Sequence, residues 1–307
     1  MSATEHRPDV TFVIAAYNAE ATLARAIGSA LAQRSVAVEV VVVDDCSTDA
    51  TCEVAQTFRD PRVRIIRQRK NGGPGRARNA GIAAATGTWI AVLDSDDSIR
   101  PDRSRNMVAR AEVADAQVVV DNLEVVPMNG GRPYRMFTEE ELRSRAELAL
   151  PDYIDSNVIF RSTFNFGYMK PMYSREFLLR HDLGFDETLR IGEDYILMAS
   201  ALASGARCAV EPSAGYVYHL REQSISRVLE LHHVESMLAA DRTLLQRFPL
   251  KGRAAAAQGR RTRSLDEARS FLMLVQQIKK RSAGGILKTA IGNPRALRHL
   301  RMPIAVR

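Results

Sequence analysis

The amino-acid sequence predicts an α/β fold with a mostly parallel central sheet, flanked by helices and followed by a helical C-terminal extension. Within the first hundred residues, apolar runs of strand length alternate with amphipathic stretches of helix length, which is the pattern of βαβ units. Several of these apolar runs end in polar motifs. Beyond residue 228 the apolar residues recur at helical spacing, as in VESMLAADRTLLQRF.

Four strands are expected in this first part. They are residues 10–15, 38–43, 63–67 and 88–93, and the helices between them are residues 19–33, 51–58 and 76–86. Crossovers of this length join parallel strands. Open parallel sheets bind ligands beyond the carboxyl ends of their strands, so the motifs at those ends should meet at one edge.

The pattern is less regular from about residue 115. We expect a strand at 117–120, a turn at MNGGRP, an irregular acidic stretch at TEEELRSR, a helix at 174–181, a helix from Asp194, and strands near Cys208 and Tyr216. The predicted division is a domain at 1–228, with a first half at about 8–120 and a second at about 121–228. A basic helical extension follows at 229–307.

Composition excludes several classes of protein. A chain of 307 residues, 46% hydrophobic and 26% charged, can bury a substantial core. Its three cysteines, Cys46, Cys52 and Cys208, lack paired spacing, which argues against a disulfide framework or a zinc knuckle and is typical of a cytosolic protein. The start MSATEHRPDV lacks the features of a secretion signal, and no apolar stretch approaches the about 20 residues of a membrane-spanning helix.

The formal charge of +7 arises mainly after residue 240, in RRTR, KKR and the residues that follow. Such a tail can bind an anionic membrane, where each Lys or Arg contributes about 1 kcal/mol. It can equally be a solvated helical extension or a packing partner for the sheet domain. No recognition motif for DNA or RNA accompanies it, so we expect no nucleic-acid partner.

Two polar motifs precede predicted helices in the first half. In DDCSTD, Ser47, Thr48 and Asp49 are candidate helix caps, whereas Asp44 and Asp45 need a donor, for which a nucleobase N–H is one candidate. The glycine-rich NGGPGRARNAG can approach a phosphate closely, or it can be a plain surface loop. It contains neither the GxGxxG fingerprint nor the end of a P-loop.

Three aspartates crowd the end of the fourth strand in DSDD. Asp94, Asp96 and Asp97 can form a solvated turn that caps the following helix. Alternatively, carboxylates two residues apart can face one hard cation, and Mg²⁺ or Mn²⁺ leaves coordination positions open to substrate phosphates.

Two further motifs lie in the second half. In GED, Glu193 and Asp194 are favourable at a helix N-terminus, and two adjacent carboxylates can also supply a general base. His219, in YVYHLREQSIS, is either a packed residue or a ligand for a transition metal.

Together these motifs resemble those of the family 2 glycosyltransferases, which have the GT-A fold. The matching segments are AAYNAEATLARAIGSALAQ, VVVDDCSTDAT, NGGPGRARNAGI, GTWIAVLDSDD, GED and YHLREQSIS, in this order over residues 8–228. In detail the chain resembles bacterial succinoglycan-type exopolysaccharide glucosyltransferases. It departs from the common pattern in having AAYN where many members have a proline before the tyrosine, and in a second aspartate directly after DxD.

On the nucleotide side, the resemblance implies that Ala15, Tyr17 and Asp45 contact the nucleoside of a UDP-sugar. Asp45 would accept from the uracil N–H. Arg78 would lie near the base or the diphosphate, and Asp94 near the ribose.

On the reaction side, the resemblance implies that Asp96 ligates Mg²⁺ or Mn²⁺ bridging the diphosphate. His219 falls where some members supply a further metal or diphosphate contact, and Asp97 stays open between a second ligand and a helix cap. Asp194 matches the catalytic base.

The implied function is inverting transfer of a hexose, glucose from UDP-glucose, to a lipid-linked saccharide in exopolysaccharide biosynthesis. The alternative is a non-catalytic, membrane-docked assembly partner that binds nucleotide-sugar. We expect a cytoplasmic protein, peripheral on the inner face of the cytoplasmic membrane. Residues 121–190 should shape the acceptor pocket, where Phe164, Phe166, Tyr168 and Tyr173 either stack on sugar rings or pack in the core.

Overall fold

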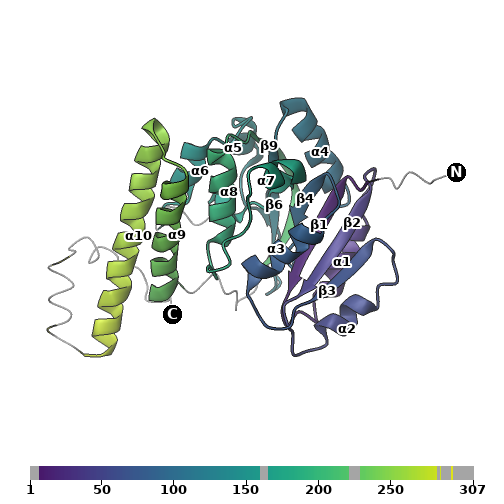
Figure 1. Cartoon of the computed structure of the whole chain (residues 1–307), viewed down its shortest axis with the longest axis horizontal. Helices are drawn as coiled ribbons and strands as arrows, with labels where there is room; N and C mark the ends of the chain where they lie inside the picture. Colours follow the sequence, from purple (N-terminus) through teal and green to yellow (C-terminus); the bar gives the residue numbers. More distant parts are fainter. Residues whose placement is uncertain (1–6, 160–164, 221–228, 282–283, 285–291, 293–307) are drawn as a thin grey trace.

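The computed structural model describes residues 7–159, 165–220 and 229–281, together with residues 284 and 292. Within these residues a nine-stranded sheet has the order β3-β2-β1-β4-β8-β6-β9-β5, and β7 pairs with β6. Helices flank the sheet, and two long helices, α9 and α10, stand at the end of the molecule opposite β2 and β3 (Figure 1).

The first half of the chain builds the parallel half of the sheet. Its strands are β1 (Val10–Ala16), β2 (Val38–Asp44), β3 (Val63–Arg67) and β4 (Trp89–Val92). β1 lies between β2 and β4, and β3 is the outer strand beside β2. The buried, β-branched run of β2 is typical of a strand covered on both faces. All four predicted strands are confirmed, with ends that differ by at most one residue.

The helices of this half are α1 (Leu23–Leu31), α2 (Thr51–Gln56) and α3 (Pro74–Ala84). α1 begins four residues later than predicted, and backbone N–H groups just before it are bound by the loop that precedes α2 and by the first residue of α2. The Ala19 N–H donates to Thr51 Oγ1 at 2.7 Å and the Glu20 N–H to Asp49 Oδ2 at 3.2 Å. The loop before α2 therefore holds the loop before α1.

The chain after β4 extends the sheet with shorter, mostly antiparallel pairings. Its strands are β5 (Ser98–Ile99), β6 (Val118–Pro127), β7 (Tyr134–Arg135), β8 (Met172–Ser174) and β9 (Cys208–Leu220). The long β6–β9 ladder is parallel, so the sheet is mostly parallel as predicted. The two strands expected near Cys208 and Tyr216 are one strand, because register shifts against β6 absorb the irregular residues between them.

In the described part of the chain, five α-helices follow β4 before the C-terminal hairpin. The sequence did not predict three of them, α4 (Arg103–Ala114), α5 (Glu139–Arg143) and α6 (Leu150–Ser156). The other two, α7 (Arg175–Arg180) and α8 (Glu193–Ala203), were predicted. The acidic TEEELRSR, expected to be irregular, forms α5. Thr138 Oγ1 accepts the Glu141 N–H at 3.2 Å, and glutamates fill the first turn, where the helix dipole favours anions.

The C-terminal hairpin consists of α9 (Leu231–Arg247) and α10 (Gly252–Lys279). Val234 and Leu238 of α9 pack with Leu265 of α10 in a small buried cluster, while Leu244 and Ala257 join the main core. Of the alternatives for the extension, packing against the sheet domain is therefore what the described part does. No helix in the described residues is long and apolar enough to cross a membrane.

Candidate active site

The carboxyl ends of β1 and β2 lie side by side and bring the first two motifs together. The Asp45 N–H donates to the Ala16 carbonyl at 2.8 Å, and Asn18 Oδ1 accepts the Thr48 N–H at 2.9 Å. Ala15 is the residue before the last of β1, and the Tyr17 side chain beyond the strand is 50% exposed. An exposed aromatic ring at this edge suits contact with a flat ligand group.

Asp45 connects β2 to the glycine-rich loop. Its carboxylate accepts the Gly72 N–H at 2.8 Å and the Gly73 N–H at 2.7 Å. Gly73 has φ +87°, and a Cβ there would meet the Arg190 guanidinium at 2.4 Å, so this position requires glycine. Asp45 thus shapes the loop, and its contact with a uracil N–H stays a prediction.

Asp44 lies beside Asp45 and is almost completely buried. Its Oδ1 accepts the Ser47 N–H at 3.0 Å, and Arg67 Nε lies 3.5 Å from Oδ2. Among the described residues Oδ2 has no hydrogen-bond partner, which is costly for a buried carboxylate oxygen. The nearby Arg67 guanidinium partly compensates the charge of this oxygen.

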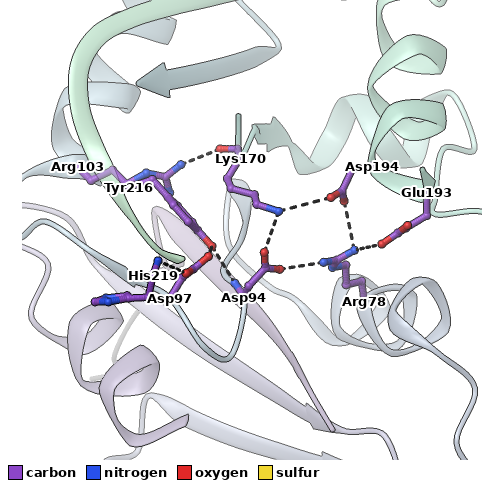
Figure 2. A network of polar contacts seen from close by, with 9 residues as sticks. All are labelled: Arg78, Asp94, Asp97, Arg103, Lys170, Glu193, Asp194, Tyr216 and His219. Atoms are coloured by element: carbon purple, nitrogen blue, oxygen red, sulfur yellow. Dashed lines mark hydrogen bonds and ion pairs between the residues drawn. The ribbon is translucent and has the colours of Figure 1, made fainter. Parts of the chain in front are cut away.

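Arg78 of α3 is the centre of a buried charge network (Figure 2). Its guanidinium lies 2.8 Å from Asp94 Oδ1, 2.7 Å from Glu193 Oε1 and 3.2 Å from Asp194 Oδ1. Burial alone would lower the pKa of Arg78, but the three carboxylates outweigh it and raise that pKa. Arg78 therefore joins the DSDD and GED motifs, which are about a hundred residues apart in the sequence.

Lys170 completes the network from the opposite side. Its Nζ lies 2.8 Å from Asp94 Oδ2 and 3.5 Å from Asp194 Oδ2 (Figure 2). Sequence reasoning missed this residue, because NFGYMKPMY drew attention to its aromatic side chains. The available signal was a single lysine between apolar neighbours, just before a short strand.

The network contains more carboxylates than cations. Burial opposes ionisation of Asp94, but Lys170 and Arg78 prevail and hold its pKa well below the usual range. Burial and the adjacent Asp194 raise the pKa of Glu193 although Arg78 is close. Asp194 has the longest contacts and, at 29%, the most exposed side chain of the three acids. It is the carboxylate best able to accept another proton donor.

Asp97 is neither a helix cap nor an open carboxylate in this structure. Its Oδ2 accepts the Tyr216 hydroxyl and its Oδ1 the His219 N–H, both at 2.8 Å. Burial, followed by repulsion from Asp94 and Asp96, raises the pKa of Asp97 to about 8. The alternative that DSDD caps the following helix is wrong, because β5 follows the motif and α4 begins only after Asp102.

Asp96 and His219 are the remaining predicted metal-site residues. Asp96 is half-buried, and its carbonyl oxygen accepts from Arg25. His219 Nε2 lies 3.0 Å from Ser98 Oγ, and its ring is directed away from the Asp94–Asp194 network (Figure 2). No cluster of three or more His, Cys, Asp or Glu side chains that could hold a metal occurs within the described part of the chain. Because Mg²⁺ commonly binds through one or two carboxylates plus substrate phosphates, the donor set fits a cation completed by substrate.

Of the predicted acceptor-site aromatics, Phe166 and Tyr173 pack in the core. Tyr168 is partly buried and lies edge-on to Tyr218, with ring centroids 6.3 Å apart. Phe164 lies outside the described residues, as does 221–226 of the YHLREQSIS motif.

Comparison with known proteins assigns the class. The sequence model of glycosyl transferase family 2 matches residues 11–177, more than half of the chain. The chain belongs to this family and is a glycosyltransferase, as the motifs predicted. The match includes DSDD and ends before GED and His219.

Two relatives are proteins of Rhizobium meliloti (strain 1021). The succinoglycan biosynthesis protein ExoO is 63% identical over 300 residues, which are 98% of this chain and 86% of the relative. The succinoglycan biosynthesis protein ExoU is 36% identical over 94% of this chain and 84% of its own length. The predicted resemblance to succinoglycan-type enzymes is confirmed.

Solved structures of Staphylococcus aureus TarS 1-349 have the same fold. The complex with UDP-GlcNAc matches with a TM-score of 0.62 and 22% identity, over 94% of this chain and 79% of that one. The complex with UDP matches with a TM-score of 0.59 and 22% identity, over 93% and 77%. At this identity the likeness concerns the fold, and it confirms the predicted GT-A architecture.

Proposed function

We propose that this chain is an inverting, divalent-metal-dependent glycosyltransferase that moves a hexose, glucose from UDP-glucose, to a lipid-linked saccharide in exopolysaccharide biosynthesis of the succinoglycan type. The observation that carries the proposal is that Arg78 contacts both Asp94 and Asp194, at 2.8 and 3.2 Å. A donor-side carboxylate and a candidate base are thereby held within one small site. The relationship to ExoO supports the pathway, and TarS bound to UDP and UDP-GlcNAc supports the kind of donor.

The nucleoside is proposed to bind beyond the carboxyl ends of β1 and β2, with Tyr17 beside the base and the backbone near Ala15 lining it. Asp45 holds the glycine-rich loop against this edge. The Asp45 carboxylate, which also accepts the Gly72 and Gly73 N–H groups, would accept the uracil N–H. Arg78, which contacts Asp94, would lie near the diphosphate.

A divalent cation, Mg²⁺ or Mn²⁺, would be held by Asp96, with His219 as the further contact. When bound, it would supply Lewis-acid stabilisation to the departing diphosphate. The oxygens of Asp94 are held by Arg78 and Lys170, and those of Asp97 by Tyr216 and the backbone of His219. Asp94 would orient the donor by its ribose, because Arg78 and Lys170 fix both of its oxygens.

Asp194 is proposed as the base that takes the proton of the acceptor hydroxyl. Its contacts with Arg78 and Lys170 exceed 3 Å, whereas the same cations lie within 2.8 Å of other carboxylates. An acceptor hydroxyl can therefore compete for it. Attack from the face opposite the diphosphate would invert the anomeric carbon in a single displacement.

The acceptor is proposed to be carried by a lipid, with the protein bound peripherally to the inner face of the cytoplasmic membrane. The end of α10 and the residue after it expose Lys279 and Lys280, which would face anionic headgroups together with the basic residues beyond. This attachment predicts salt-sensitive binding to vesicles that contain anionic lipid. The alternative function, a non-catalytic assembly partner, predicts UDP-sugar binding without transfer.

Replacing Asp194 by Asn tests the proposal. Purified protein with Mn²⁺ and a lipid-linked acceptor should release UDP from UDP-glucose. Asp194→Asn should lower kcat by about 10²- to 10⁴-fold, because a general base contributes that much, while calorimetric UDP-glucose binding stays near the wild-type value.

The exposed Asp182→Asn is the matched control, since it removes one carboxylate of the same type from the surface. It should leave kcat unchanged. Normal turnover by Asp194→Asn would remove this residue as the base. Binding without turnover by the wild-type protein, across a panel of acceptors, would favour the assembly partner.

A further inference from the structure

Lys170 is a buried charged residue in this site that no motif accounts for. It lies just before β8, which pairs antiparallel with β4, so continuing the register Ala91↔Met172 brings residue 170 beside residue 93. The side chain is 12% exposed, and its Nζ is directed between Asp94 and Asp194 (Figure 2). A lysine is rarely buried to this extent unless it is paired.

The protein fixes the backbone of Lys170 with a second buried ion pair. Arg103 Nη2 donates to the Lys170 carbonyl at 2.7 Å, and the same guanidinium binds both oxygens of Asp121 at 2.9 Å. The Arg103 guanidinium carbon also lies 5.3 Å from the ring centroid of Tyr216, whose hydroxyl accepts the Asp94 N–H at 3.2 Å. The position of Lys170 is thus coupled to that of Asp94 through side chain and backbone.

The ammonium group suits a position between two carboxylates. It is compact, and its three N–H donors can point to separate acceptors, whereas a guanidinium imposes a planar fork. Burial alone would lower the pKa of Lys170, but Asp94 and Asp194 raise it above its ordinary value. Removing this ammonium would leave Arg78 as the cation facing the three acids of the network.

We propose that Lys170 is a positioning residue for the transfer reaction, which ties the base Asp194 to the donor-side carboxylate Asp94. This inference rests on the proposed function. The unequal contacts, 2.8 Å to Asp94 and 3.5 Å to Asp194, anchor Lys170 to the donor side and leave Asp194 able to bind the acceptor. Arg78 makes the matching connection through the other oxygens of the same two carboxylates.

The test replaces Lys170 by Met, which has a similar length and no charge. Loss of alignment between base and donor should lower kcat by about 10²-fold, a typical cost of a small misplacement in an active site. The acceptor KM should change much less than kcat. Lys251→Met, at the exposed residue just before α10, removes one positive charge outside the site and should leave both constants unchanged.

A double variant separates positioning from a purely structural effect. If Lys170 acts through Asp194, then Lys170→Met combined with Asp194→Asn should be no slower than Asp194→Asn alone. Independent, multiplicative losses would overturn the inference, as would a Lys170→Met kcat within twofold of the wild-type value. UDP binding stoichiometry measures the folded fraction in each preparation.

Lys170→Arg keeps the test decisive if Lys170→Met does not fold. The charge is retained, so this variant should bind UDP and recover part of the kcat, and its loss should again vanish in the Asp194→Asn background. Two results would overturn positioning by the ammonium. One is a wild-type kcat for Lys170→Arg, and the other is a further fall in kcat when Lys170→Arg is added to Asp194→Asn. Failure of the wild-type protein to transfer sugar is a separate outcome, which would reject the proposed function itself.

Discussion

Three aspartates within four residues have three different environments. Asp94 is paired by cations on both oxygens, Asp96 is half-buried, and Asp97 is buried and bound to Tyr216 and His219. The cations beside Asp94 and the donors to Asp97 reduce the cost of crowding this negative charge. The same residue type therefore has a different structural role at each of these three positions.

Tyr216→Phe tests the role of Tyr216 in this division. The Tyr216 hydroxyl donates to Asp97 Oδ2 and accepts the Asp94 N–H. Without it, the Asp97 oxygen and the Asp94 N–H each lose this hydrogen bond. The free energy of unfolding should fall by about 1–3 kcal/mol, as urea denaturation would measure. Tyr134→Phe, at a 41% exposed tyrosine, is the control and should change it little. Equal stabilities of Tyr216→Phe and the wild type would contradict this account.

At the scale of elements, the C-terminal hairpin holds the helix that begins with Glu193 and Asp194. The Tyr195 hydroxyl donates to Gln258 Oε1 at 3.3 Å, and the Arg261 guanidinium lies 3.5 Å from the Tyr195 ring centroid. Arg261 also pairs with Asp241 of α9 at 3.0 Å. α8, α9 and α10 are therefore connected by buried polar contacts directly behind the site.

Arg261→Met should destabilise the protein by about 3–5 kcal/mol, because it leaves Asp241 buried without its cation. The double variant Arg261→Met with Asp241→Leu should recover much of this loss, since an apolar pair can replace a buried ion pair. Arg260→Met removes the neighbouring exposed contact with Asp155 and should cost about 0–1 kcal/mol. Urea unfolding measures the free energy of unfolding of the three variants. Similar decreases for Arg260→Met and Arg261→Met would contradict the difference between an exposed and a buried ion pair.

At the scale of the whole molecule, the hairpin belongs to the folded unit that carries the site. It contributes Leu244 and Ala257 to the main core and covers Tyr195. It also packs Met237 near Gly192, the residue before α8, where a Cβ would lie 3.3 Å from the methionine. The predicted boundary at residue 228 thus separates segments that share a core.

A protein that ends at residue 228 should lose its cooperative unfolding transition and its UDP release, because the apolar surface behind α8 would be exposed to water. A protein that ends at residue 281 keeps both helices of the hairpin and should retain both properties. Circular dichroism on heating measures the unfolding transition of the two shortened proteins, and the UDP-release assay measures their activity. A cooperative transition in the shorter protein would show that the hairpin is dispensable for folding.

The parallel strands, the helices between them and the ligand-binding edge could be predicted because their signals are local. Buried strands such as VEVVVV are recognisable as apolar runs of strand length, and the length of each crossover requires parallel pairing. The order of the motifs then indicated the family. α4 and α5 were missed because their apolar periodicity is weak.

By itself, the sequence determined the α/β class, the family and the residues at the strand ends, since each follows from patterns within a few tens of residues. Only the tertiary structure decided which distant side chains contact these residues. Lys170 meets Asp94, and Arg261 packs on the ring of Tyr195, across separations that no local pattern reports. A single lysine or arginine in a sequence resembles a surface residue, and it becomes part of a site when folding buries it beside a carboxylate.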